Sequence, residues 1–144
     1  MSAARDHHRL LVVGNWKLNT TVDEGRTLAR SVVDAVRDIR EVEVAVLPPF
    51  THLWPVHAEL QRSAVLLGAQ DVFWEDSGAY TGEISPLMLA GWCDLVLTGH
   101  SERRHLLGER DQEVGRKLAR SLQHGLRVIV AVGETEAERD AGQT

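Results

Sequence analysis

The sequence predicts an α/β protein with a parallel sheet, and two observations carry this prediction. Short apolar runs rich in valine and leucine recur along the 144 residues, and helix-like stretches lie between them. Continuous apolar runs of this length are typical of strands that are buried on both faces. Strands that alternate with helices indicate βαβ units and therefore parallel pairing. The runs are Leu10–Gly14, Val42–Leu47, Ala64–Ala69, Asp94–Thr98 and Arg127–Val132.

The stretch after the first run opens with a clear helix start. Thr21 and Glu24 have the capping-box spacing, in which each side chain bonds the backbone N–H of the other residue. Apolar residues at helical spacing follow and predict an amphipathic helix. This stripe consists of Leu28, Val32 and Val36, with Ala29 and Val33 beside them.

Two more helix starts precede the fourth run. Thr51 begins one candidate helix, which has Pro55 near its first turn. Ser85 and Pro86 form an N-cap followed by a proline at the first helical position, and they open the segment Leu87–Gly91. The inward-facing residues of the helix that begins at Thr51 are expected to be Leu53, Val56 and Leu60.

The last two helix starts flank the fifth run. Asp111 opens a helix that is expected to end with Gly125 at its C′ position. Thr135 starts a final helix, which continues toward the end of the sequence. The apolar residues in line on the helix that begins at Asp111 are Val114, Leu118 and Leu122.

The size of the repeating unit leaves two architectures open. Each strand–helix unit occupies roughly 30 residues, so eight such units would make a (β/α)8 barrel of about 250 residues. This sequence contains about four and a half units, which we expect to form a single domain over residues 1–144. The pattern alone is compatible with half a barrel and with a small doubly wound sheet.

Composition excludes several classes of function. The formal net charge of −5 argues against a general nucleic-acid binder, which usually carries a basic patch. No apolar run approaches the length that spans a bilayer, and the polar segment Met1–Arg9 does not resemble a secretory signal. The single cysteine, Cys93, excludes an intrachain disulfide and a cysteine-based metal site. We therefore expect a cytoplasmic protein.

Polar residues that follow the strands are the candidates for chemistry, because ligands bind at the carboxyl ends of parallel strands. Asn15 and Lys17 follow the first run. They are either an amide and a cation that bind an anionic or carbonyl substrate, or solvated residues of a loop. His100 follows the fourth run, before a helix start whose N–H groups and dipole disfavour a charged imidazolium. Glu134 follows the fifth run as a base or a structural hydrogen-bond acceptor.

Five motifs occur in the order and spacing of the triosephosphate isomerase family, and the chain resembles the N-terminal part of that family. The resemblance runs from about Leu10 to the end and covers somewhat over half of the usual family length. It implies an incomplete TIM (β/α)8 barrel of about five parallel strands with intervening helices. The motifs are Gly14–Asn19, Gly68–Asp71, Gly78–Ser85, Gly99–Arg104 and Gly133–Glu134.

The resemblance also implies a reaction. The family interconverts dihydroxyacetone phosphate and glyceraldehyde 3-phosphate through an enediolate, as part of glycolysis and gluconeogenesis, and needs no cofactor or metal. By this resemblance Lys17 is a catalytic and substrate-binding cation, and Asn15 is a substrate-binding amide. His100 is the neutral catalytic electrophile that polarises the carbonyl. Ser101 and Glu102 support these groups. Thr81 lies in a loop that reaches into the neighbouring subunit of a homodimer.

The sequence also departs from the family pattern. The glutamate segment that supplies the family's general base, the lid behind it and the later phosphate-binding loops are absent. We therefore expect the chain alone to be inactive, as a truncated isomerase that needs a completing half-barrel. Two alternatives stay open: a non-catalytic half-barrel module that assembles with a partner, and another phosphate-handling barrel enzyme that uses Lys17, His100 and Glu134.

An incomplete barrel also predicts exposed apolar surface. The first and fifth strands would both be edges with unpaired backbone groups. The inner faces of the strands would lack an opposite wall, so such a chain should pair with something or aggregate. The inner-face residues are expected to be Val12, Val44, Val65, Val96 and Val130.

Overall fold

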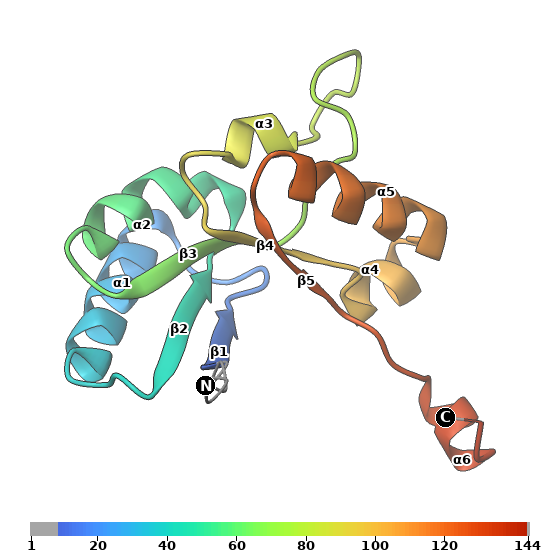
Figure 1. Cartoon of the computed structure of the whole chain (residues 1–144), viewed down its shortest axis with the longest axis horizontal. Coiled ribbons are helices and arrows are strands. Elements are labelled where there is room, and N and C mark those ends of the chain that lie inside the picture. Colours follow the sequence, from blue (N-terminus) through green and yellow to red (C-terminus); the bar gives the residue numbers. More distant parts are fainter. Residues whose placement is uncertain (1–8, 144) are drawn as a thin grey trace, which may run out of the picture. The chain divides into compact units, whose positions relative to one another are not determined.

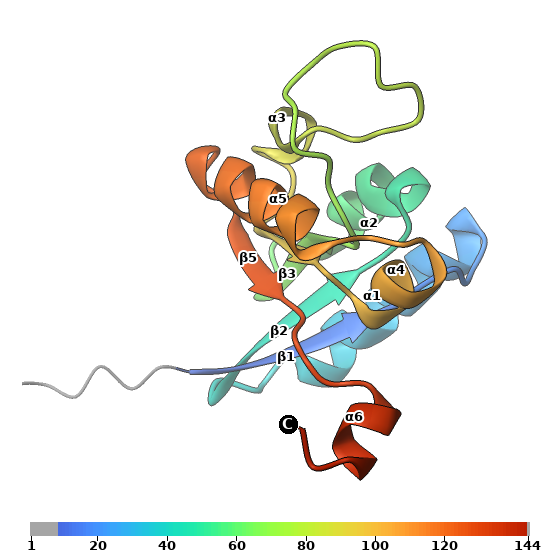
Figure 2. The ribbon, with the colours of Figure 1, turned by 90° about the vertical axis from the view of Figure 1, so that its right-hand side faces the viewer.

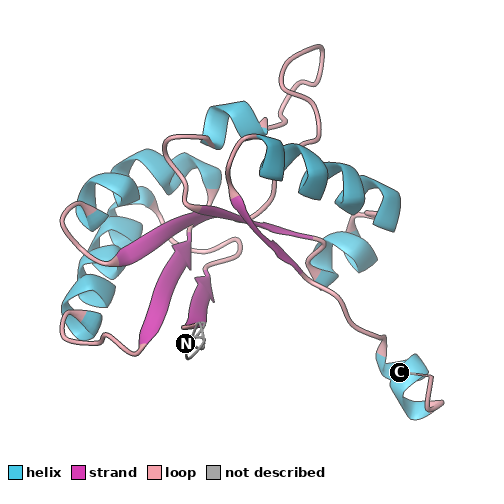
Figure 3. Ribbon diagram, in the orientation of Figure 1, coloured by secondary structure: helices cyan, strands magenta, loops and turns pink. Residues whose placement is uncertain are grey.

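The computed structural model describes residues 9–143 (Figure 1). The expectation that Met1–Arg9 is not a secretory signal concerns residues that, except for Arg9, lie outside the described part of the chain. The chain forms two compact units. Unit 1 contains Met1–Gln70 and the short segment Trp92–Asp94, and unit 2 contains Asp71–Gly91 and Leu95–Thr144. In both units strands alternate with helices, as the sequence predicts (Figure 3).

Unit 1 contains a parallel sheet of three strands with helices between them. Its strands follow one another in the sheet in chain order, with Val12 opposite Val44 and Val44 opposite Val65. The predicted strand positions are confirmed to within a residue or two. The elements are β1 (Leu10–Asn15), α1 (Val22–Val36), β2 (Val42–Leu47), the 3-10 turn η1 (Phe50–His52), α2 (Leu53–Leu60) and β3 (Val65–Ala69).

Helix α1 begins as predicted, but Ala29 is the only residue of the predicted stripe that is fully buried. Thr21 is its N-cap, and Thr21 and Glu24 form the complete capping box. The buried residues are Gly25 and Ala29, whereas Leu28 is 39% exposed. A Cβ on Gly25 would lie only 2.8 Å from the His52 ring, so the close approach of the helix admits only small residues on this side. The predicted stripe therefore lies partly toward solvent.

Unit 2 contains two parallel strands and four helices. Val96 lies opposite Val128, and Thr98 lies opposite Val130. The long loop before α3 projects beyond that helix in two perpendicular views (Figures 1 and 2). The elements are α3 (Pro86–Leu89), β4 (Leu95–Thr98), α4 (Ser101–Leu106), α5 (Asp111–Gln123), β5 (Arg127–Val130) and α6 (Glu136–Asp140).

The predicted caps in unit 2 are confirmed. Ser85 caps α3, which ends at Leu89, two residues before the expected Gly91. Gly125 has a φ of +76° directly after the C-cap of α5, as a C′ residue should. Thr135 forms a capping box with Glu138 at the start of α6. Each of these signals lies within a few residues of the helix end that it determines.

The buried face of α5 differs from the predicted stripe. Val114 is buried as expected, but Leu122 is 56% exposed, and Lys117 and Ser121 occupy the remaining buried positions. The Lys117 ammonium lies 2.7 and 2.8 Å from the two carboxylate oxygens of Asp71 and also contacts Glu109. A lysine can be buried here because two carboxylates neutralise it.

Two carboxylates and a second cation lie together around this ammonium. We call them the Lys117 cluster, which consists of Asp71, Arg103, Glu109 and Lys117. Arg103 Nε lies 2.9 Å from Asp71 Oδ2. Burial raises the pKa of Asp71, although the charges of Lys117 and Arg103 oppose the shift. Burial also acts to raise the pKa of Glu109, but its interactions with Lys117 and Arg103 outweigh burial and hold that pKa below its usual value.

The expectation for the inner-face valines is correct for Val12 on the edge strand β1 and wrong for Val65 on β3 and Val96 on β4. Val12 on β1 is 56% exposed, whereas Val65 is 6% exposed and Val96 is fully buried. Val65 and Val96 each lie beside a valine of the neighbouring strand, Val44 and Val128, which covers part of their surface. The exposed apolar surface is therefore confined to part of the predicted face.

Removing the buried ammonium should destabilise unit 2 strongly. Lys117→Met leaves Asp71 and Glu109 buried without their main partner, and loss of one member of a buried pair costs about 3–5 kcal/mol. We expect urea denaturation to show a decrease of this size in the free energy of unfolding. Arg116→Met is the matched control, because it removes only an exposed cation near the Trp74 ring and should cost less than about 1 kcal/mol. Equal effects of the two variants would contradict this account.

The buried thiol of Cys93 should be inert in the folded chain. Burial, with a smaller effect of the Asp94 charge, raises the pKa of Cys93 to about 12. At pH 8 a thiol with this pKa is ionised in about one molecule in 10,000, against roughly one in four in an unfolded chain. We expect alkylation by iodoacetamide to be at least about a thousandfold slower in buffer than in urea. Similar rates in the two conditions would show that the thiol is not buried.

Candidate active site

The loop after β1 holds Lys17 in a strained conformation. Lys17 has a φ of +55°, a region that non-glycine residues rarely adopt and that costs about 1 kcal/mol or more. Its backbone N–H donates to Asn15 Oδ1 at 3.0 Å. Nearby, Asn19 Nδ2 donates to the Trp16 carbonyl at 2.7 Å, and Trp16 itself is buried. Side-chain amides therefore fix the backbone from which the Lys17 ammonium extends.

Gln70 completes this loop from the end of β3. Its Nε2 donates to the Lys17 carbonyl at 2.8 Å and to the Leu47 carbonyl at 2.9 Å. The same Leu47 oxygen accepts a hydrogen bond from the Trp16 N–H at 3.0 Å. Gln70 thus connects the ends of three strands of unit 1. The sequence pattern did not predict this role, and the one signal that could have drawn attention to Gln70 is its position directly after an apolar run.

His100 lies between β4 and α4, where it is the N-cap of the helix. Its Nδ1 lies 3.3 Å from the backbone nitrogen of Glu102 and also 3.3 Å from Glu102 Oε2. The backbone N–H always carries its proton, so this hydrogen bond requires an unprotonated Nδ1. The neutral ring then carries its proton on Nε2, where it can donate to a substrate oxygen.

A cavity of about 240 Å³ lies beside His100 in unit 2. It is lined by His100 and Ser101 from the β4 side and by Glu134 from the segment after β5, and Arg104 and His105 complete the polar lining. A space of this size holds several water molecules, each of which takes up about 30 Å³ in the liquid. The structure thus brings His100, Ser101 and Glu134 together around one space.

Glu134 is held as a structural carboxylate. Arg139 Nε donates to Glu134 Oε1 at 2.8 Å. This hydrogen bond is the main reason that the pKa of Glu134 lies below its usual value. A carboxylate with a lowered pKa is a weaker proton acceptor, and an effective general base has a pKa near the working pH. The geometry therefore favours the structural alternative for Glu134.

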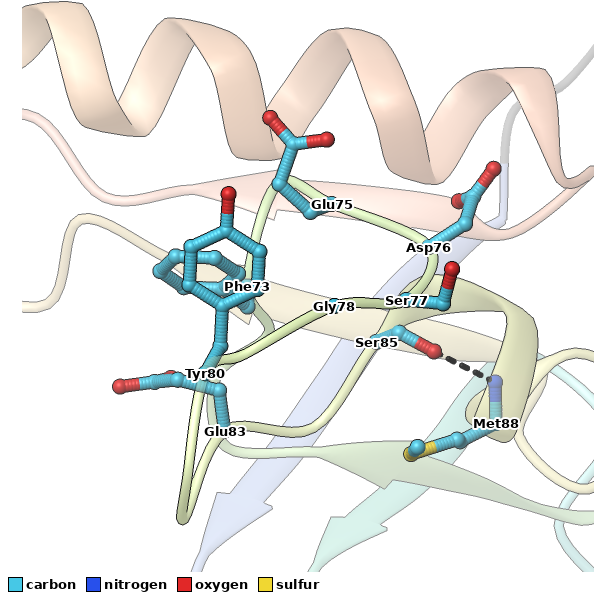
Figure 4. A pocket seen from close by; sticks show the side chains of 9 residues that line it. All are labelled: Phe73, Glu75, Asp76, Ser77, Gly78, Tyr80, Glu83, Ser85 and Met88. Atoms are coloured by element: carbon cyan, nitrogen blue, oxygen red, sulfur yellow. Dashed lines mark hydrogen bonds between the residues drawn. The ribbon is translucent and has the colours of Figure 1, made fainter.

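The loop that carries Thr81 is ordered by aromatic packing. The Phe73 ring lies against Tyr80, with 4.7 Å between ring centroids, and the Phe73 N–H donates to the Ile84 carbonyl at 2.8 Å. Figure 4 shows Phe73 and Tyr80 at the wall of a small cavity of about 60 Å³. Gly78 has a φ of +140°, and a Cβ there would meet the Tyr80 ring at 2.7 Å. Thr81 is exposed in this loop.

The predicted site residues are divided between the two units. Asn15 and Lys17 lie in unit 1, and His100, Ser101 and Glu102 lie in unit 2 with Thr81. Within residues 9–143, no three side chains of histidine, cysteine, aspartate or glutamate are grouped to hold a metal ion. No helix in the same range is both long and apolar enough to cross a membrane.

Comparisons of the sequence with known proteins indicate one family. The family model for triosephosphate isomerase matches residues 10–144. A triosephosphate isomerase of Dehalococcoides mccartyi is 46% identical over 136 residues, which is 94% of this chain and 54% of that protein. A triosephosphate isomerase of Chloroflexus aurantiacus is 48% identical over 134 residues, or 92% of this chain and 54% of its own length. The chain thus spans about half the length of the curated relatives it matches.

A solved structure agrees with these sequences. The crystal structure of triosephosphate isomerase from Bartonella henselae superimposes with a TM-score of 0.88 and 34% sequence identity. The match covers 94% of this chain and 56% of that one. It confirms the predicted fold class, an incomplete (β/α)8 barrel with five parallel strands. With the family model matched over residues 10–144, the chain belongs to the triosephosphate isomerase family.

Proposed function

We propose that this chain provides the cation and the electrophile of a triosephosphate isomerase site, and that a completing half-barrel provides the rest. The reaction would interconvert dihydroxyacetone phosphate and D-glyceraldehyde 3-phosphate through an enediolate. The observation that carries the proposal is the geometry of His100, whose Nδ1 lies 3.3 Å from the Glu102 N–H and whose Nε2 is therefore the donor. The family match supports the choice of substrate.

Each residue has a defined part in this reaction. When the carbon proton leaves the substrate, negative charge develops on the carbonyl oxygen, and the His100 Nε2–H donates to that oxygen. The Lys17 ammonium would neutralise the same charge, and Asn15 would bind the substrate beside it. The strained backbone at Lys17 would keep the ammonium in place before the substrate arrives. Ser101 and Glu102 would support the His100 turn.

Neither the general base nor a phosphate-binding loop is assigned to any residue among those that the structure describes, 9–143. Glu134 is paired with Arg139 and is a poor candidate for the base. We therefore propose that the isolated chain is inactive and that a partner contributes these parts. A single partial barrel domain over residues 1–144, a homodimer that involves Thr81, and a place in cytoplasmic glycolysis belong to the same proposal.

A non-catalytic assembly module is the second candidate function. The exposed apolar residues of β1, Leu10 at 74% and Val12 at 56%, favour a surface that pairs with another chain. On this hypothesis the chain forms a defined homo-oligomer without isomerase activity, which light scattering after size-exclusion chromatography would detect. A polydisperse aggregate would count against it.

An isomerase assay tests the main proposal. The chain is produced in a host without its own isomerase and is assayed alone and after co-expression with the C-terminal part of the Chloroflexus aurantiacus relative. We expect no turnover for the chain alone and measurable turnover for the pair. His100→Gln should lower kcat of the pair by about 100- to 1,000-fold, the usual effect of removing one such donor.

The matched control is His57→Gln, the same change on α2 outside the site, which should leave kcat unchanged. Turnover of the pair that survives His100→Gln at full rate would show that His100 is not the electrophile.

A further inference from the structure

Arg104 connects the two strand ends that flank the His100 cavity. Its Nε donates to the Gly99 carbonyl at 2.7 Å, and its Nη2 donates to the Ala131 carbonyl at 3.3 Å. Gly99 directly follows β4, and Ala131 directly follows β5. The backbone N–H of Arg104 also donates to the His100 carbonyl at 3.1 Å. Arg104 therefore bonds the carbonyl of the peptide that leads into His100 and the carbonyl of the peptide that follows it.

The turn before His100 is shaped around this guanidinium. Gly99 has a φ of +70°, and a Cβ at this position would lie 2.8 Å from Arg104 Nη2. The same Cβ would lie 3.1 Å from the Ala131 carbonyl oxygen and from Val114 Cγ1. The guanidinium thus fills the space that a side chain would occupy. The same Arg104 Nη2 and Ala131 oxygen that form the hydrogen bond therefore close the space beside Gly99, and Val114 adds an apolar contact.

Arginine suits this position because its donors form a rigid planar fork. Its Nε donates to the carbonyl after β4 and its Nη2 donates to the carbonyl after β5. A lysine ammonium has no such fixed arrangement of donors. The third contact of Arg104 is with Asp111 Oδ1 at 2.5 Å, but the Asp111 side chain is 90% exposed. Exposed ion pairs contribute little, so the two carbonyl contacts are the ones that matter.

We propose that Arg104 is a positioning residue for His100. It holds the Gly99 and Ala131 carbonyls and thereby fixes the turn in which the Glu102 N–H meets His100 Nδ1. That hydrogen bond keeps the ring proton on Nε2, so Arg104 determines the tautomer of His100 through the backbone. This inference rests on the proposed function of His100, because the tautomer matters for catalysis only if the ring donates to a substrate oxygen.

Nitrogen-15 NMR of the histidine rings tests the proposal in the chain itself. In a single tautomer the two ring nitrogens have widely separated shifts, and exchange between tautomers moves both toward a common value. The His100 signals are assigned by their loss in His100→Gln. We expect wide separation in the unaltered chain at a pH where the ring is neutral and a clear reduction of the separation in Arg104→Met.

Two further variants show whether Arg104 acts through its carbonyl contacts or through its ion pair with Asp111. Asp111→Asn removes the exposed ion pair but keeps both carbonyl contacts, so it should leave the separation unchanged. Arg104→Lys keeps the charge but only part of the fork, so it should give an intermediate separation. Circular dichroism establishes that each variant is folded, and if Arg104→Met does not fold, Arg104→Lys decides the question.

An unchanged separation in a folded Arg104 variant would overturn the proposal. An equal reduction in Asp111→Asn would also overturn it, because Arg104 would then act through the ion pair. The measurement needs no turnover. A failed isomerase assay would therefore remove the catalytic meaning of the tautomer, whereas the NMR result would still show whether Arg104 controls it.

Discussion

A buried lysine imposes the constraint on which unit 2 depends. Lys117 is 2% exposed, and a buried ammonium is tolerated only when it is paired and hydrogen-bonded. Asp71, at the start of the long loop, and Glu109, before α5, must therefore stay close to it. Arg103 on α4 lies 2.9 Å from the same Asp71 carboxylate. The Lys117 cluster thus holds together the loop that carries Thr81 and the helix that follows His100.

The two units hold their functional side chains by the same physical means. In unit 1 the amide of Gln70 bonds two backbone carbonyls and keeps Lys17 at a positive φ. In unit 2 the guanidinium of Arg104 bonds two backbone carbonyls next to His100. A carbonyl oxygen has two lone pairs, so a side-chain donor can bond it at a strand end even where a backbone N–H does too, as Gln70 and Trp16 both bond the Leu47 oxygen. The free energy of these hydrogen bonds can offset the strain of the positive φ at Lys17. Such an arrangement is expected where a site is organised before the substrate binds.

The sequence was sufficient for features that depend on neighbouring residues. The capping box at Thr21, the helix start at Thr135 and the glycine after α5 are local, and the structure confirms all three. Buried faces were harder to predict because distant partners decide them. Lys117 can be buried because carboxylates neutralise it, and one of them, Asp71, lies 46 residues away in the sequence. Leu28 is partly exposed because Gly25 allows α1 to approach His52.

In the candidate site, too, the sequence predicts what depends on neighbouring residues and misses what depends on distant partners. The rule that ligands bind at strand ends was enough to select Lys17 and His100 as candidates. It could not select the bonds from Gln70 and Arg104, because these are made to backbone carbonyls that have no sequence signature. The pairing of Glu134 with Arg139 was also invisible in the pattern, although it decides how basic that carboxylate is.

The central claim is that Lys17 and His100 act on one substrate, and a titration observed by NMR tests it most directly. The chain, co-expressed with the completing part of the Chloroflexus aurantiacus relative, is titrated with a phosphate-bearing analogue of the enediolate. We predict that the signals of the Lys17 ammonium and the His100 ring both shift, with the same apparent Kd. A response of only one of them, or two different Kd values, would contradict the claim.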